Sequence, residues 1–176
     1  YVLRTKAGEK IYLLVYVDDI LMAAKSNKIL DALEAKLKSA FELRNLGEAK
    51  FFLGMEIKRD RSARTVTISQ PRMIADLLSQ YEMKDCKARA VPLSPSDGLT
   101  AATSEEELLD TTQFTYSSLV GSLLYLSNST RPDIVYAVNK LARYMAAPTE
   151  EHWLAAKGVL RYLAGTPNLG ITYGGN

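Results

Sequence analysis

Residues 11–24 of the chain read IYLLVYVDDILMAA, and this stretch decides the fold that the sequence predicts. Residues 11–17 are apolar, β-branched or aromatic, and a second apolar run, residues 20–24, follows Asp18 and Asp19. Runs of this kind favour strands, and polar residues between two of them favour a turn. The stretch therefore predicts a buried β-hairpin with two acids at its tip.

After the hairpin, apolar residues recur at the spacing of one helix face. Ser26 suits the N-cap of a helix whose apolar face would be formed by Ile29, Leu30, Leu33, Leu37 and Phe41. Residues 51–57 and 65–68 then flank a polar turn and predict a second hairpin. Ser69 and Pro71 can begin another helix, with an apolar stripe of Met73, Ile74, Leu77, Leu78 and Tyr81. Residues 1–85 are thus expected to form one mixed α+β unit.

The pattern changes after residue 85. Residues 86–113 have no sustained apolar period and are broken by Pro92, Pro95 and Gly98, which predicts a linker or a long surface loop. The fold class expected for the whole chain is α+β, with the mixed part followed by a helical region, residues 114–176.

Three successive helices are predicted within that last region. Thr149 suits the N-cap of the third helix, and Gly165 with Pro167 would end it. A short strand at residues 170–173 is expected to follow.

Bulk composition narrows the class of protein without naming a function. The formal net charge is +2, from 22 Lys+Arg against 20 Asp+Glu, so any nucleic-acid binding must come from local patches. Cys86 is the only cysteine and cannot form an internal disulfide, which favours an intracellular, cytoplasmic protein. No run reaches the roughly 18 apolar residues of a membrane span, so no membrane partner is expected. The start at Tyr1 indicates a piece of something longer.

The acid pair at the hairpin tip carries the clearest chemistry. Asp18 and Asp19 repel each other, and a divalent cation would compensate two carboxylates beside an apolar core. Nucleotidyl transfer uses two such ions, one at the attacking hydroxyl and one at the leaving group. The alternative is an ordinary polar turn, in which Asp is common. A third possibility is an unrelated Mg²⁺ enzyme, which would need Glu56 or Asp60 to converge on the pair.

Five ordered blocks of sequence point to a family. They are YVDDILMAAKS, LGEAKFFLGMEIKRD, ISQPRMIADLLSQYEMKDCKARAVPL, FTYSSLVGSLLYLSNSTRPDIVYAV and RYMAAPTEEHWLAAKGVLRYLAGTPNLGITY. In order and spacing they resemble the copia-type reverse transcriptase of long-terminal-repeat retrotransposons, over nearly the whole chain. The resemblance implies a partial polymerase palm in residues 1–85, then thumb and connection helices.

The resemblance also implies site residues. Asp18 and Asp19 would be two of the three catalytic acids and would bind Mg²⁺ (or Mn²⁺), while Tyr16 and Val17 would lie beneath the primer end and the template. A primer-grip hairpin would present Leu53, Gly54 and Met55. From the residues alone, Gly54 is also compatible with a β-bulge that contacts no ligand. Met73 stands where the family usually has tyrosine.

Basic residues on the later helices are candidate phosphate contacts, as thumb and connection helices make in such enzymes: Arg131, Lys140, Arg143, Lys157 and Arg161. Arg131 is the strongest of these candidates. Its alternative role is to pair with Asp133 or to bond carbonyls at the end of the preceding helix. His152 and Cys86 receive no catalytic role, and Trp153 is expected in the core.

By the same resemblance, several parts of the parent enzyme lie outside this sequence. The first catalytic acid and the fingers would precede it, and an RNase H domain would follow. We therefore expect no polymerase activity and no tight metal binding from residues 1–176 alone. The parent's partners would be an RNA/DNA template-primer, dNTPs and the rest of its polyprotein, which includes an integrase, with assembly in a virus-like particle. The alternative is a non-catalytic remnant that binds nucleic acid or protein.

Overall fold

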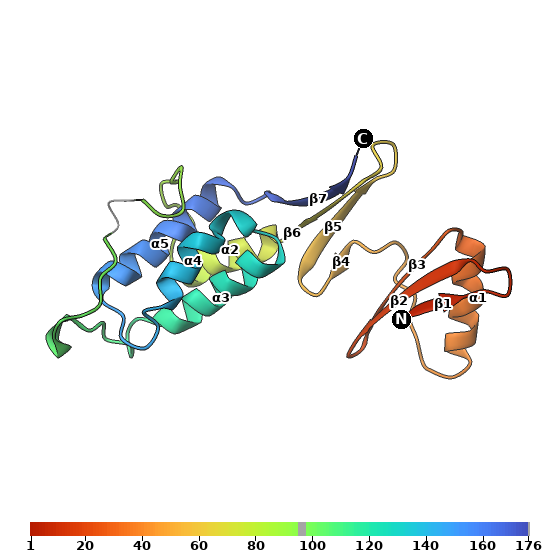
Figure 1. Ribbon diagram of the computed structural model, residues 1–176, viewed down its shortest axis with the longest axis horizontal. Coiled ribbons are helices and arrows are strands. Elements are labelled where there is room, and N and C mark those ends of the chain that lie inside the picture. The colour runs from red at the N-terminus through yellow and green to blue at the C-terminus, as the bar shows by residue number, and fades with distance from the viewer. Residues whose placement is uncertain (95–97, 176) are drawn as a thin grey trace. The chain divides into compact units, whose positions relative to one another are not determined.

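The computed structural model describes residues 1–94 and 98–175, and Pro95 of the predicted linker lies outside them. The chain separates into two units, Tyr1–Leu53 and Gly54–Asn176 (Figure 1). The α+β class is confirmed, with two small sheets and several helices. The division into palm, linker and thumb-like regions concerns the parent enzyme and stays a prediction.

The first unit holds the predicted hairpin. Strands β2 (Lys10–Tyr16) and β3 (Asp19–Ala24) pair antiparallel, and an additional strand that was not predicted, β1 (Val2–Arg4), pairs with β2. Helix α1 (Asn27–Lys38) follows, with Ser26 as its N-cap as predicted. The extended backbone of Ser26 lets the chain turn from the strand into the helix.

The prediction that this hairpin is buried is wrong. Ile11 is its only buried apolar residue among those described, and Tyr12, Leu14 and Tyr16 are 52%, 50% and 56% exposed. Side chains alternate between the two faces of a strand, and a single helix can cover only one of them. One face of the β1-β2-β3 sheet, defined by Val2, Tyr12, Leu14 and Tyr16, is therefore open and apolar.

A second sheet has the order β4-β5-β6-β7. Its members are β4 (Phe51–Phe52), β5 (Met55–Asp60), β6 (Thr65–Ser69) and β7 (Gly170–Gly174). The predicted second hairpin is confirmed as β5-β6. The expected single strand over residues 51–57 is wrong, because the backbone at Leu53 and Gly54 is left-handed and breaks it into β4 and β5.

Strand β7 confirms the predicted short strand, and its partner is β6, about 100 residues earlier in the chain. The register sets Ile68 opposite Ile171 and Thr67 opposite Thr172, whose hydroxyl oxygens lie 2.8 Å apart. The sheet thus joins the two ends of the second unit.

The helices of the second unit form its core (Figure 1). They are α2 (Pro71–Gln80), α3 (Tyr116–Ser129), α4 (Val135–Ala142) and α5 (Glu150–Gly165), with short 3-10 turns η1 (Glu105–Glu107) and η2 (Pro132–Ile134). The three predicted later helices are confirmed, as is Thr149 as the N-cap of α5. The N-cap of α2 is Gln70 rather than Ser69, because Ser69 still pairs within β6.

The described residues of 86–113 include the 3-10 turn η1 and are otherwise irregular, and several of them are fastened to the helices. Leu99 is buried, the Arg89 amide donates to the Arg161 carbonyl, and the Leu109 amide donates to the Pro148 carbonyl at 2.7 Å. Among the described residues, no helix has both the length and the apolar character needed to cross a bilayer.

Candidate metal and nucleic-acid site

The tip of the β2-β3 hairpin presents the acid pair to solvent. Tyr16 pairs with Asp19, so Val17 and Asp18 form a two-residue turn, and Val17 is 86% exposed. Asp18 and Asp19 are both exposed, and within residues 1–94 and 98–175 neither carboxylate has a hydrogen-bond or ion-pair partner. Two open carboxylates on the end of a strand pair suit a hard divalent cation, which prefers oxygen ligands.

Val17 sits in a conformation that is costly for its residue type. Its φ is +52°, in the left-handed region, where a β-branched side chain is a genuine outlier. Backbone strain of this kind occurs at functional sites, where neighbouring structure over-determines it. The two-residue connection between β2 and β3 imposes it here.

Two carboxylates do not make a complete metal site. No group of three or more His, Cys, Asp or Glu that could hold a metal ion occurs among the residues described. Glu56 lies 3.7 Å from the Lys58 amine, and Asp60 accepts hydrogen bonds from Ser62 and from the Ala63 amide. The Ser62 hydroxyl, followed by that amide, lowers the pKa of Asp60. Both acids thus have structural partners.

The Leu53-Gly54 turn gives the candidate primer-contacting segment its shape. Leu53 and Gly54 have φ of +50° and +75°, as a tight two-residue hairpin turn requires, so the β-bulge alternative is wrong. Met55 begins β5 directly after the turn. A Cβ on Gly54 would lie 4.0 Å from the Tyr125 hydroxyl and otherwise in open space, so the backbone here is accessible.

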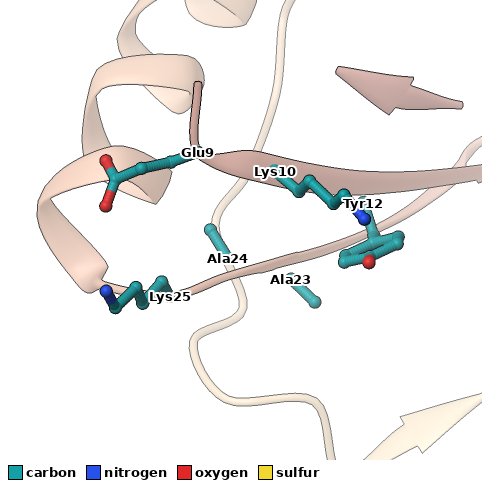
Figure 2. A pocket seen from close by; sticks show the side chains of 6 residues that line it. All are labelled: Glu9, Lys10, Tyr12, Ala23, Ala24 and Lys25. Carbon is teal, nitrogen blue, oxygen red and sulfur yellow. The ribbon is translucent and has the colours of Figure 1, made fainter. Parts of the chain in front are cut away.

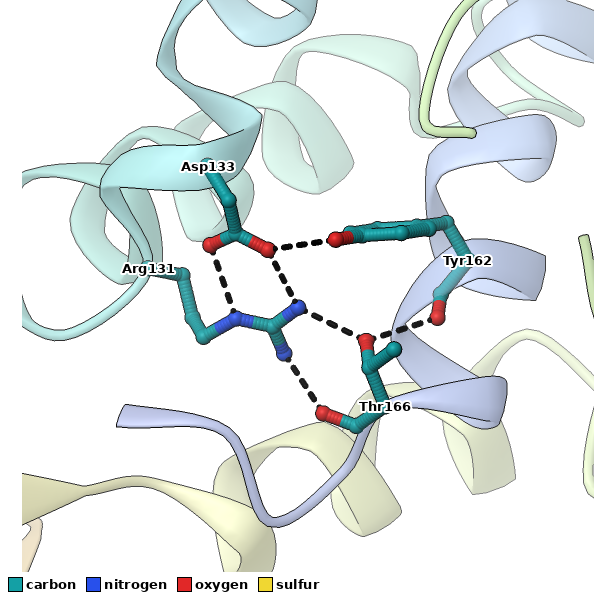
Figure 3. Close-up of polar contacts among 4 residues, drawn as sticks. All are labelled: Arg131, Asp133, Tyr162 and Thr166. Atoms are coloured by element: carbon teal, nitrogen blue, oxygen red, sulfur yellow. Dashed lines mark hydrogen bonds and ion pairs between the residues drawn. The ribbon is translucent and has the colours of Figure 1, made fainter. Parts of the chain in front are cut away.

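Arg131 is not on the surface. Its side chain is fully buried and forks onto Asp133, with Nε–Oδ1 and Nη2–Oδ2 distances of 3.0 and 2.7 Å (Figure 3). The guanidinium also donates to the carbonyl and the hydroxyl of Thr166, at 2.9 and 2.7 Å. The alternative role, pairing with Asp133, is confirmed. The carbonyl that Arg131 bonds belongs to Thr166, the C-cap residue of α5, and not to the helix that precedes Arg131.

Asp133 and Tyr162 complete this cluster. The Tyr162 hydroxyl donates to Asp133 Oδ2 at 2.8 Å (Figure 3). Arg131 Cζ lies over the face of the Tyr162 ring, 5.5 Å from the ring centroid. Burial raises the pKa of Asp133, but hydrogen bonds from Arg131 and Tyr162 outweigh it and leave that pKa below its usual value. Burial, then the bond to Asp133, raises the pKa of Tyr162. At neutral pH, Asp133 is therefore ionised and the Tyr162 hydroxyl keeps its proton.

The other four phosphate candidates lie on α4, its C-cap and α5. Arg143 is exposed, whereas Lys140, Lys157 and Arg161 are half-buried. Arg161 Nε donates to the Lys87 carbonyl at 2.7 Å, so that side chain also fastens the loop. Their availability to a phosphate therefore differs, with Arg143 the most accessible.

His152 was missed as a structural residue. It is fully buried, accepts the Thr149 amide at Nδ1 (2.9 Å) to complete a capping box, and stacks on Tyr144 with ring centroids 4.0 Å apart. Its spacing from Thr149 is that of the Glu or Gln in a capping box, a signal the sequence did carry. Trp153 is half-buried against the core beside Phe114, so its core role is confirmed.

A shallow hollow lies at the other end of the β2-β3 hairpin from the acids. It is lined by Glu9, Lys10, Tyr12, Ala23, Ala24 and Lys25 (Figure 2). The two small alanines leave the space open, and its lining offers no cluster of acids or nucleophiles. We assign it no chemistry.

Comparison with known proteins places the chain among retrotransposon sequences. Residues 1–95 match the family described as reverse transcriptase (RNA-dependent DNA polymerase). The chain is 37% identical over 179 residues to the Retrovirus-related Pol polyprotein from transposon TNT 1-94 of Nicotiana tabacum, covering 100% of the chain and 14% of that protein. It is 45% identical over 161 residues to the Pol polyprotein from transposon RE1 of Arabidopsis thaliana, covering 92% of the chain and 11% of that protein.

A shorter relative also matches. The putative transposon Ty5-1 protein of Saccharomyces cerevisiae is 37% identical over 170 residues, covering 97% of the chain and 54% of that protein. No solved structure matches the chain. The chain thus spans only a small part of the long Pol polyproteins and about half of the yeast protein.

Proposed function

Because the chain belongs to the reverse transcriptase (RNA-dependent DNA polymerase) family of copia-type retrotransposon Pol polyproteins, we propose that Asp18 and Asp19 are metal-binding acids of a polymerase active site. The observation that carries the proposal is the acid pair at the turn of β2-β3, open to solvent, within the matched residues 1–95. The reaction proposed for the parent is RNA-directed DNA synthesis.

The residues present fit part of a two-metal site. Asp18 and Asp19 would hold Mg²⁺ (or Mn²⁺), which in such sites activates the primer hydroxyl and steadies the leaving group. The short turn limits where the two carboxylates can move, which suits a site that must keep its ligands in place. A third acid from the rest of the parent would complete the set, so we propose that residues 1–176 alone do not polymerise.

The proposed primer and template contacts are Tyr16 and Val17 at one turn and Leu53, Gly54 and Met55 at the other. Each turn has backbone that a nucleic-acid strand can approach: Val17 is highly exposed, and Gly54 has no side chain. In this proposal residues 1–85 are part of the palm, residues 114–176 resemble thumb and connection, and residues 86–113 join them. An intracellular site of action stays a prediction from the sequence.

Phosphate contacts are proposed for Lys140, Arg143, Lys157 and Arg161. Arg131 is left out because its guanidinium is buried and bonded to Asp133 and Thr166. The proposed ligand of the parent is an RNA/DNA template-primer with dNTPs, bound together with the remainder of the polyprotein.

A graft tests the catalytic proposal. The segment of the tobacco Pol polyprotein that aligns with this chain is replaced by the chain, and primer extension is measured with Mg²⁺. We expect Asp18→Asn to lower incorporation by at least 100-fold, as loss of transition-state charge stabilisation does, and Asp31→Asn, an exposed acid on α1, to leave it unchanged. A graft that keeps its activity with Asp18→Asn would contradict the proposal.

A second candidate is a non-catalytic remnant that binds nucleic acid or protein. It is favoured by the open apolar face of the first sheet, since large exposed apolar patches mark interaction surfaces. The same graft separates the two, because a remnant would not support primer extension in any background.

A further inference from the structure

The tip of the β5-β6 hairpin concentrates positive charge. Residues 58–64 read KRDRSAR, all of them exposed, with four cations and one acid, Asp60. The segment carries a formal charge of +3 in a chain whose total is +2, so the rest of the chain sums to −1. A local excess of positive charge, which the small net charge of the whole chain does not show, therefore lies at this one turn.

The single acid of this segment is occupied in shaping the turn. Asp60 Oδ1 accepts the Ser62 amide, the Ser62 hydroxyl and the Ala63 amide, at 2.9, 2.6 and 2.9 Å. The hydrogen bonds to Asp60 therefore fix the conformation of the turn. Arg59 precedes the turn, and Arg61 and Arg64 are part of it. Like charges so close repel, and a polyanionic ligand would relieve that repulsion.

The strands beside the turn add groups suited to a nucleic acid. Arg59 lies opposite Val66, which lies opposite Tyr173, so Arg59 and Tyr173 share one face of the sheet, and Tyr173 is 57% exposed. Next to Arg64, a Cβ on Gly174 would collide with the Arg64 carbonyl oxygen, and the Gly175 amide donates to that same oxygen at 3.3 Å. The end of β7 is therefore held against the turn, which keeps Tyr173 beside the arginines.

From this geometry we propose that the KRDRSAR turn is a phosphate-binding site for the nucleic-acid backbone, separate from the basic residues of α4 and α5. The proposal rests on the proposed function in that its ligand is a nucleic acid. Guanidinium groups bind phosphate oxygens in pairs, and the segment holds three of them. Residues 61–64 contain no large apolar side chain that could enter a lipid layer, which favours nucleic acid over a membrane surface.

Fluorescence anisotropy with a labelled primer-template DNA duplex tests the site, using the full chain at 50 to 200 mM salt. The altered protein carries Arg59→Gln, Arg61→Gln and Arg64→Gln. The matched control carries Lys28→Gln, Lys84→Gln and Lys87→Gln, three exposed residues whose loss changes the net charge equally. Thermal unfolding of both variants checks that each is folded.

We expect the hairpin variant to bind about 10- to 100-fold more weakly at the lowest salt, with a slope of log affinity against log salt shallower by about 3. The control should stay within about 3-fold of the unaltered chain. Equal loss in both variants overturns the proposal, as does equal hairpin-dependent binding to phosphatidylserine vesicles. If the hairpin variant binds the duplex as tightly as the unaltered chain, the KRDRSAR site is refuted but the proposed function is not. If the unaltered chain does not bind the duplex at all, both the site and the proposed template contacts are refuted.

Discussion

At the scale of single residues, substituting Arg131 tests whether its hydrogen bonds to Asp133 and Thr166 stabilise the fold. Arg131→Gln would remove the charged partner of Asp133, which would keep the Tyr162 hydroxyl, and would remove the two donors to Thr166. Loss of the buried partner of such a pair costs about 3 kcal/mol of unfolding free energy. Denaturant unfolding of the two proteins measures the difference. Arg143→Gln, at an exposed site, should change stability by less than about 0.5 kcal/mol. Equal effects of the two changes would contradict the buried network.

His152 predicts a dependence of stability on pH. Burial lowers its pKa, although Glu151 opposes the shift, so the folded protein binds a proton less readily than the unfolded chain. Its contribution is complete above the unfolded pKa of about 6.5 and is lost as the pH falls through the lower folded pKa. His152→Gln keeps an acceptor for the Thr149 amide and should remove this dependence. Unfolding curves between pH 5 and 8 for both proteins decide it, because the chain has no other histidine.

The sequence could place these residues but not their environments. The i, i+2 spacing of Arg131 and Asp133 allowed a pair, and the pair forms, yet Thr166 and Tyr162 come from a helix about 30 residues later. Burial of a charged side chain depends on that distant helix, and nothing local to Arg131 records it. The acid pair could be recognised from the sequence because the turn that carries it is formed by neighbouring residues alone.

At the scale of elements, the Leu53-Gly54 turn predicts a stabilising change. The left-handed backbone of Leu53 is energetically unfavourable for leucine, and asparagine adopts this conformation more easily. Leu53→Asn should therefore stabilise the protein by about 0.5–1 kcal/mol, measured by chemical denaturation. Leu46→Asn, a similarly polar change at an exposed leucine without positive φ, should give no such gain. A loss of stability at Leu53→Asn would show that the leucine side chain matters more than the turn.

Strand β7 depends on a missing side chain. A Cβ on Gly170 would collide with the Ile68 carbonyl oxygen, which belongs to the backbone and cannot swing away. Gly170→Ala should detach β7 from β6, seen as faster amide hydrogen exchange at Ile171 and Tyr173. Gly121→Ala on α3, where the new methyl meets open space, should instead stabilise by about 0.5–1 kcal/mol. Unchanged exchange in β7 after Gly170→Ala would refute this role of the glycine.

Periodicity predicted most elements because the apolar stripe of a helix and the runs of a strand are local signals. It did not predict that β7 pairs with β6, since a short strand does not name its partner. It also missed the break at Leu53, where the turn geometry overrides a run of strand-forming residues.

At the scale of the whole chain, the two units should differ in stability. The core cluster of buried side chains comes from the second unit, while Ile11 is the only buried apolar residue described in the first. We expect the amides of β2 and β3 to exchange faster than those of α3 and α5, because little apolar burial resists local opening. Hydrogen exchange read by mass spectrometry measures both. Equal protection throughout would mean that the chain unfolds as one cooperative body.

The order of β6 and β7 in the chain has a consequence during synthesis. At about 5–20 residues per second, roughly 5–20 seconds separate the emergence of Thr65–Ser69 from that of Gly170–Gly174. For that interval the nascent polypeptide displays an unsatisfied strand edge outside the ribosome, which is a template for wrong pairing with neighbouring nascent chains. Crowded polysomes translating this message would therefore depend on chaperones that shield the edge until its late partner arrives.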